Sequence, residues 1–162
     1  MTNDLFITVG CMGSGKSTLL RPFEPMVLST DTIRLQLVQP TKKGIDQTCT
    51  GKMLKILDEC LDYRCSKGCT SVIDACHSTI ESITRYYKYI EQYEYKIWII
   101  DFRHVPLKEC LLNNKNRPMF KLVPEDVIIT TYNNLQMLVL PSWAQRITPE
   151  KVLPILIKLK TW

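Results

Sequence analysis

Residues 5–18 read LFITVGCMGSGKST, and this stretch decides the fold. Its first five residues are apolar except for Thr8 and are followed by Gly10, which is typical of a buried strand in a parallel sheet. Residues 10–17 fit the pattern G-x-x-x-x-G-K-[ST] of a phosphate-binding loop, or P-loop. We expect a helix to begin near Lys16, so the order strand, loop, helix gives the motif the context it requires.

The residue types in this loop suit the phosphates of a nucleoside triphosphate. Glycines let backbone N–H groups turn inward, and the N-terminus of the following helix adds a favourable dipole for an anion. Lys16 is expected to reach the β- and γ-phosphates, and the Ser17 hydroxyl to bind Mg²⁺. The alternative is a glycine-rich turn that fits by chance, which the preceding strand and Thr18 argue against. The predicted cofactors are ATP or GTP with Mg²⁺, bound by Gly10, Gly13, Ser14, Gly15, Lys16, Ser17 and Thr18.

Strands and helices alternate along the rest of the chain. This order predicts an α/β fold, a P-loop NTPase three-layer sandwich with a central parallel sheet of four or five strands. We expect one kinase domain over residues 1–162, and we assign no structure to the last twenty residues, where Pro154 should break or kink a helix that starts near Thr148. The further expected strands are 26–28, 71–74 and 97–101, and the expected helices are about 32–38, 50–65, 79–93 and 105–114 and one starting at Pro124.

Composition limits the class of protein and of partner. The chain has 162 residues, of which 45% are hydrophobic, enough for one globular domain without disulfides or a structural metal. The formal charge is 21 − 16 = +5, which suits a polyanionic partner such as nucleic acid or nucleotide, or else an ordinary basic surface. There are seven cysteines, an odd number, and one of them, Cys11, lies within the P-loop. With no leader segment and no apolar run long enough for a bilayer, we expect reduced thiols, a cytoplasmic setting and no membrane.

A second group of polar residues follows the expected second and third strands. Ligands bind at the carboxyl edge of such sheets, where Asp31 and Asp74 should both lie. Asp31 can accept a proton from an attacking hydroxyl, and Arg34, one helical turn on, can bind a phosphate of the acceptor. Asp74 can hold the Mg²⁺ shell through water or order Asp31. The ordinary alternatives are a helix cap for Asp31, a solvated arginine for Arg34 and a loop cap for Asp74.

The loop 114–121 is basic. It holds Lys115, Arg117 and Lys121, and an arginine there can fold over the γ-phosphate as a lid and neutralise charge in the transition state. The alternative is a solvated basic loop. His77 is expected to be incidental, and Asp101 to be a turn carboxylate.

Taken together, these motifs resemble the polynucleotide 5′-hydroxyl kinase family over residues 3–137. The combination is GCMGSGKST, then D-x-x-R after the second strand, an aspartate ending the third, and N-x-x-x-R-P in the lid. The resemblance implies that Asp31 is the general base, that Arg34 holds the phosphate on the 3′ side of the acceptor nucleotide, that Asp74 lies in the active site and that Arg117 is the lid arginine.

Two departures from the family pattern stand out. Asn113 replaces a basic residue that related lids often carry, which would weaken triphosphate binding or shift the choice of donor. No D-x-D-G-T motif of an attached phosphatase is present in the sequence.

We therefore predict an ATP-dependent kinase with an arginine-bearing lid, which phosphorylates the 5′-hydroxyl end of RNA or DNA. The catalytic residues would be Asp31, Lys16 and Arg117, with Arg34 and Asp74 binding the acceptor and Ser17 the metal. Two alternatives stay open: a small-molecule kinase for a nucleoside, sugar acid or antibiotic hydroxyl, and a nucleotide-dependent binding module with little turnover. The sequence leaves the choice of RNA or DNA, of ATP or GTP, and the oligomeric state undecided.

Overall fold

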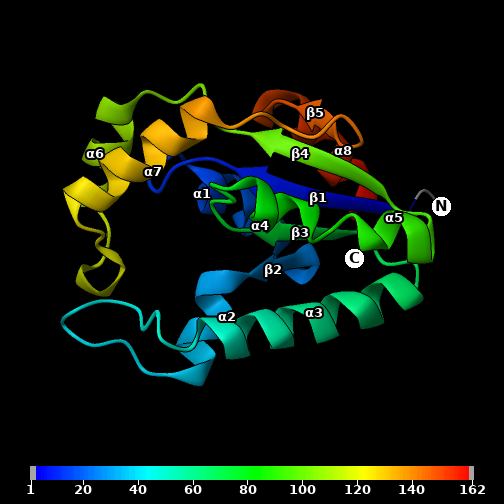
Figure 1. The fold of residues 1–162 in the computed structure, drawn as a ribbon, viewed down its shortest axis with the longest axis horizontal. Helices are drawn as coiled ribbons and strands as arrows, with labels where there is room; N and C mark the ends of the chain where they lie inside the picture. Colours follow the sequence, from blue (N-terminus) through cyan, green and yellow to red (C-terminus); the bar gives the residue numbers. More distant parts are fainter. Residues whose placement is uncertain (1–2, 161–162) are drawn as a thin grey trace.

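A computed structural model describes residues 3–160 and contains a central sheet of five parallel strands (Figure 1). The spatial order is β2-β3-β1-β4-β5, so β1, which leads into the P-loop, is the middle strand. Parallel pairing joins every neighbouring pair of strands. The predicted α/β fold with a parallel sheet is confirmed. The strands are β1 (Asp4–Val9), β2 (Val27–Ser29), β3 (Ser71–Asp74), β4 (Lys96–Asp101) and β5 (Gln145–Ile147).

Helices cover both faces of this sheet. Because side chains alternate along a strand, Leu5 and Ile7 of β1 join one core cluster, with α3 and α6, while Phe6 joins the other, with α1 and α8. Burial on both faces explains the nearly continuous apolar sequence of β1 and β4. The helices are α1 (Lys16–Leu20), α2 (Thr30–Leu37), α3 (Thr50–Ser66), α4 (Ile80–Thr84), α5 (Lys88–Tyr93), α6 (Leu107–Lys115), α7 (Glu125–Met137) and α8 (Pro149–Leu159), with 3₁₀ turns η1 (Arg21–Met26) and η2 (Met119–Lys121). Within residues 3–160, no helix has the length and apolar character needed to cross a bilayer.

The prediction of one helix over residues 79–93 is wrong. The structure has two short helices, α4 and α5, separated by a turn at residues 85–87. Hydrogen bonds from Tyr86 N to Ile83 O and from Tyr87 N to Thr84 O tighten this turn. The tightening shifts the helical phase, so that Tyr86 and Tyr89 are buried and Tyr87, which one continuous helix would place on the same face as Ile83, is exposed.

The last part of the chain completes the sheet. The strand β5 lies in the region to which the sequence assigned no structure, and α8 follows it. Of the two effects expected of Pro154, a break or a kink, the break is wrong, because α8 continues through this residue. Proline removes one backbone N–H donor, while Val152 and Leu156 on the same helix are fully buried in the second core cluster. That burial outweighs one lost hydrogen bond.

Candidate functional site

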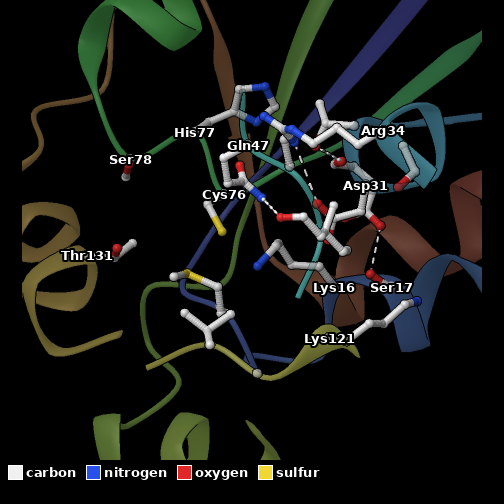
Figure 2. Close-up of a pocket in the computed structure, with 18 of the residues that line it drawn as sticks. Lys16, Ser17, Asp31, Arg34, Gln47, Cys76, His77, Ser78, Lys121 and Thr131 are labelled. Carbon is white, nitrogen blue, oxygen red and sulfur yellow. Dashed lines mark hydrogen bonds and ion pairs between the residues drawn. The ribbon is translucent and has the colours of Figure 1, made fainter. Parts of the chain in front are cut away.

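One large pocket opens at the carboxyl edge of the sheet (Figure 2). Its volume is about 1230 Å³, and the P-loop, α2, α3, the loop after β3 and the loop after α6 all contribute to its walls. Because all strands run parallel, the P-loop after β1, the start of α2 after β2 and the end of β3 meet here. Of the residues singled out from sequence, the pocket is lined by Gly13, Gly15, Lys16, Ser17, Thr18, Asp31, Arg34, Asp74 and Arg117, whereas Gly10 and Ser14 lie outside its lining.

The P-loop backbone depends on its glycines. Gly13 has φ +79°, and a Cβ there would lie 2.3 Å from the carbonyl oxygen of Cys110 in α6. A Cβ on Gly10 would lie 2.5 Å from the Cβ of Phe102. The Lys16 Nζ donates to the carbonyl oxygens of Gly10, at 2.9 Å, and of Cys11, at 2.6 Å. The Lys16 side chain is thereby buried against its own loop, within reach of the space that the loop backbone encloses.

Ser17 and Asp74 form a polar pair beside this loop. The Ser17 hydroxyl donates to Oδ2 of Asp74 at 2.7 Å. Burial raises the pKa of Asp74, against the lowering effects of the Ser17 hydrogen bond and the Lys16 charge. A hydroxyl and a carboxylate are hard oxygen ligands, and Mg²⁺ at phosphates commonly takes only one or two protein ligands and keeps waters. This donor set therefore fits Mg²⁺.

Asp31 is not the cap of α2. The cap is Ser29, whose hydroxyl oxygen accepts from the N–H of Thr32 at 3.3 Å. The helix begins at Thr30, two residues earlier than predicted, and Asp31 stands in its first turn with its side chain 44% exposed in the pocket. The capping alternative for Asp31 is thus excluded.

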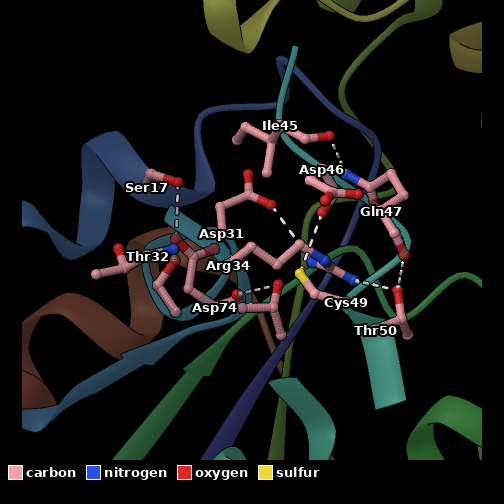
Figure 3. A network of polar contacts seen from close by, with 12 residues as sticks. Ser17, Asp31, Thr32, Arg34, Ile45, Asp46, Gln47, Cys49, Thr50 and Asp74 are labelled. Atoms are coloured by element: carbon pink, nitrogen blue, oxygen red, sulfur yellow. Dashed lines mark hydrogen bonds and ion pairs between the residues drawn. The ribbon is translucent and has the colours of Figure 1, made fainter. Parts of the chain in front are cut away.

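Arg34 lies next to Asp31 and is largely buried (Figure 3). Its side chain is 12% exposed, with Nη1 3.6 Å from Oδ1 of Asp31 and Nη2 3.4 Å from the Thr50 hydroxyl of α3. Its Nε is buried and has no hydrogen-bond partner in the described part of the chain. The alternative of a solvated helix arginine is therefore wrong, since a solvated guanidinium would have all its donors in water.

The loop after α6, which we call the lid, is attached to the P-loop through α6. The amide of Asn113, near the end of α6, donates to the carbonyl oxygen of Gly13 at 2.8 Å and so ties this helix to the P-loop. Buried Asn114 pairs with both the N–H and the carbonyl of Val123, which closes the lid at its base. Arg117 lines the pocket, whereas Lys115 is exposed and pairs with Glu125.

Comparison with known proteins gives the family. Residues 5–138 match the family described as AAA domain. The chain belongs to this AAA domain family. No curated protein is similar enough in sequence to count as a match.

Solved structures share the fold of this AAA domain. One is a candidate kinase from Chloroflexus aurantiacus, with TM-score 0.67, 11% identity and 98% of each chain covered. Another is a sugar kinase from a Janibacter species, with TM-score 0.64, 15% identity and coverage of 98% of this chain and 94% of the other. A third is a gluconokinase from Sinorhizobium meliloti, with TM-score 0.59, 12% identity and coverage of 97% and 89%. The fold is that of P-loop kinases, and at these identities the likeness reaches no further.

His77 of the AAA domain has a structural role that the sequence did not indicate. It is buried with φ +47°, its Nδ1 donates to the Thr8 carbonyl oxygen at 2.5 Å, and its Nε2 accepts from the Tyr86 hydroxyl at 3.1 Å. Burial lowers the pKa of His77 to about 4, so the ring is neutral at pH 7. The ring connects β1 to the turn between α4 and α5, and no local sequence signal marks such a long-range contact.

Two more charged residues from the sequence analysis are Lys121 and Asp101. Lys121 of the lid lines the pocket (Figure 2), and its charge lowers the pKa of Asp74, against the larger effect of burial. Asp101 is a turn carboxylate, as expected, because its Oδ1 accepts from the N–H of Arg103 at 3.0 Å. It is also buried, and its Oδ2 lies 2.9 Å from Nη2 of Arg103 and 2.6 Å from Nε of Arg146. Asp101 thus neutralises two arginines at the end of β4, away from the pocket lining.

Proposed function

We propose that this protein is a nucleoside-triphosphate-dependent phosphotransferase whose acceptor is an alcohol carrying an anionic group close to the reacting hydroxyl. The observation that carries the proposal is the pairing of Asp31, exposed in the pocket and free of capping, with Arg34, buried beside it with an unused Nε–H. A protein that only binds nucleotide has no need of a carboxylate and an arginine held side by side across the pocket from its P-loop.

The proposed roles follow from where the groups lie. Asp31 orients the acceptor hydroxyl and takes its proton. Lys16 moves from the loop carbonyls to the β- and γ-phosphates, and Arg117 approaches from the lid, so that both stabilise the transferring phosphoryl group. Ser17 and Asp74 would hold Mg²⁺, which neutralises charge on the phosphates. Positioning and electrostatics supply most of the rate in such reactions.

Two classes of acceptor share the required chemistry. A small anionic alcohol, such as a sugar acid or a phosphorylated nucleoside, is supported by the sugar kinase and the gluconokinase that share the fold. A polynucleotide 5′-hydroxyl end is supported by the D-x-x-R pair together with pocket-lining cations of the lid and of the loop before α3, Arg117, Lys121 and Lys43. We favour the small anionic alcohol as the minimal substrate, because the Asp31–Arg34 pair requires only one hydroxyl and one anion.

A panel of acceptors tests the proposal. Transfer from γ-labelled ATP and GTP is measured to gluconate, a nucleoside, the nucleoside 3′-phosphate, and 5′-hydroxyl RNA and DNA oligonucleotides. We expect the nucleoside to be a much poorer acceptor than its 3′-phosphate. Equal use of nucleoside and 3′-phosphonucleoside, or no transfer to any alcohol, would contradict the proposal.

Variants of Arg34 provide the matched control. Arg34→Lys keeps the charge but not the planar fork, so it should lose much of the preference for the anionic acceptor. Arg34→Ala should depress transfer far more than background ATP hydrolysis, since water needs no anion site. A parallel loss of transfer and hydrolysis would indicate a general structural effect instead.

We also propose a cytoplasmic, reducing setting. All seven cysteines are free in the structure, including buried Cys11 in the P-loop and Cys110 in α6. A free thiol inside a phosphate-binding loop suits a compartment that keeps thiols reduced. Differential alkylation of the protein in intact cells measures the fraction of each cysteine that is oxidised.

A further inference from the structure

The pocket continues beyond Arg34 along α3. Its floor there consists of apolar side chains from successive turns, Met53, Leu54 and Leu57. Beyond them the lining includes Arg85, which comes directly after α4. An apolar floor with an arginine at each end suits a ligand that has an uncharged body and more than one anionic group.

Arg85 is fixed in position but has hydrogen-bonding capacity to spare. Its Nη2 alone contacts Asp58 of α3, at 2.9 Å from each carboxylate oxygen. The guanidinium carbon lies 5.8 Å from the centre of the Tyr86 ring, which limits its orientation. The side chain is 24% exposed, and within residues 3–160 neither Nε nor Nη1 has a hydrogen-bond partner. Three N–H donors of a rigid fork thus remain for a ligand.

The two arginines are too far apart to bind one anion. Arg34 contacts Thr50 at the start of α3, and Arg85 contacts Asp58, eight residues later. At 1.5 Å per residue, eight residues of helix span about 12 Å. One phosphate or carboxylate cannot contact both guanidinium groups across such a span. An acceptor that uses both must carry two separate anionic groups.

We propose that Arg85 forms a second anion subsite, so that the preferred acceptor is an extended alcohol with one anion at Arg34 and another at Arg85. This inference rests on the proposed function and narrows its substrate class from a small anionic alcohol to a longer, doubly anionic one. A short 5′-hydroxyl oligonucleotide has this chemistry, and so does a sugar acid that bears a distant phosphate ester. Asp58 holds the arginine in place, and the apolar floor accommodates the body of the ligand between the anions.

The test compares acceptors with one and two anions. The probes are a nucleoside 3′-phosphate, the 5′-hydroxyl dinucleotide with a 3′-phosphate, gluconate, and a phosphate ester of gluconate, each assayed with saturating ATP. Arg85→Gln should raise the KM of the doubly anionic acceptor about tenfold, as expected for a lost hydrogen bond to a charged group, with kcat and the KM of singly anionic acceptors nearly unchanged. The pair of acceptors, nucleotides or sugar acids, in which only the doubly anionic member shows the raised KM identifies the class of acceptor.

Two control variants separate ligand binding from a structural role. Lys88→Gln removes a cation that pairs with Asp62 on the same helix α3 but lies outside the pocket lining, so it should leave every KM unchanged. Asp58→Asn removes the negative charge but leaves an amide oxygen that can still accept from Arg85 and hold it in place, so it should leave the KM of the doubly anionic acceptor unchanged or lower it. If Asp58→Asn raises that KM as much as Arg85→Gln does, the arginine is only structural and the inference is overturned.

Failure of this inference differs from failure of the proposed function. If the wild type phosphorylates singly anionic acceptors but Arg85→Gln changes no KM, or changes all of them equally, the second subsite is refuted and the proposed function stands. If the wild type phosphorylates no alcohol at all, the proposed function fails and the second subsite fails with it. Thermal unfolding of each variant confirms that the compared proteins are folded.

Discussion

The pocket has a donor half, formed by the P-loop and Asp74, and an acceptor half, formed by α2, α3 and Arg85. The two halves use their polar groups differently. In the donor half, Lys16 is bonded to carbonyls of its own loop and Ser17 to Asp74. In the acceptor half, the buried Nε of Arg34 has no partner in the described residues, and Arg85 uses one nitrogen of three. The difference teaches that the polar groups of the donor half already have partners within the protein, whereas those of the acceptor half still have free donors. Under the proposed function, the acceptor is selected by α2, α3 and the turn after α4.

The largest effect is expected for Asp31→Asn, which should change the rate of transfer but not the affinity for nucleotide. Asp31→Asn keeps the size of the side chain but cannot take a proton, so transfer should fall by roughly 10² to 10⁴. Nucleotide affinity, measured by calorimetry, should change little, because Asp31 lies in the acceptor half. If the asparagine variant keeps near-normal activity, Asp31 is not the general base, and the assignment of an acceptor half around it loses support.

Lys16→Ala tests the donor half. Transfer and background nucleotide hydrolysis should both fall by about 100-fold or more, equivalent to about 3 kcal/mol of barrier. The fold should survive, because the lysine contacts only its own loop. Initial rates measure the loss of transfer and hydrolysis, and a thermal unfolding curve shows whether the variant is folded. Near-normal activity would show that the P-loop is not the phosphate site.

Acid should disrupt the connection between the two halves. His77 joins Thr8 of the donor half to Tyr86 of the acceptor half, and its pKa is lowered to about 4 from 6.5 in the unfolded chain. Between these pH values the unfolded state binds the extra proton, so the free energy of unfolding should fall as the pH drops. The loss over that range is about 3 kcal/mol.

Denaturant titrations at several pH values between 7 and 4 measure this effect. His77→Asn is the control, because asparagine tolerates the positive φ of this position and does not titrate. The wild type should lose more stability than the variant on acidification. Equal slopes for the two proteins would show that His77 is not the group that titrates.

The smallest effect concerns the helix cap that leaves Asp31 free. Ser29→Ala removes the hydroxyl that accepts from Thr32, which should lower the free energy of unfolding by about 1 kcal/mol. For a chain of this size, the melting temperature should fall by roughly 2–4 °C. Asp31→Ala, which would remove any cap made by that side chain, should lower it less when compared in the same calorimeter. The reverse order of the two melting temperatures would assign the cap to Asp31.

The sequence predicted the central strands and the P-loop because their signals are local. A run of apolar residues followed by a glycine motif needs no distant contact to be read. Asp31 was ambiguous because Ser29, Thr30 and Asp31 can each cap a helix, and only the backbone geometry decides among them. The strand β5 was missed because it has three residues at the edge of the sheet, two of them exposed.

Arg85 escaped prediction for a different reason. An unbroken helix over residues 79–93 assigns Tyr87, rather than Tyr86, to the core and gives no reason to direct the arginine into a pocket. The tightened turn after α4 changes which side chains face α3, and it depends on the burial of Tyr86 and Tyr89 against distant parts of the chain. The roles of the site residues stay predictions until the variants above are measured.

The closure of the lid by Asn114 has a consequence for how its length can vary. One buried amide accepts from the Val123 N–H and donates to the Val123 carbonyl, so the chain enters and leaves the lid at adjacent points. Doubling the length of a loop pinned in this way costs only about 0.6 kcal/mol of closure entropy. Extra residues inserted between Asn116 and Phe120 should therefore leave the melting temperature nearly unaltered, and lids of other lengths can be grafted between these two anchors.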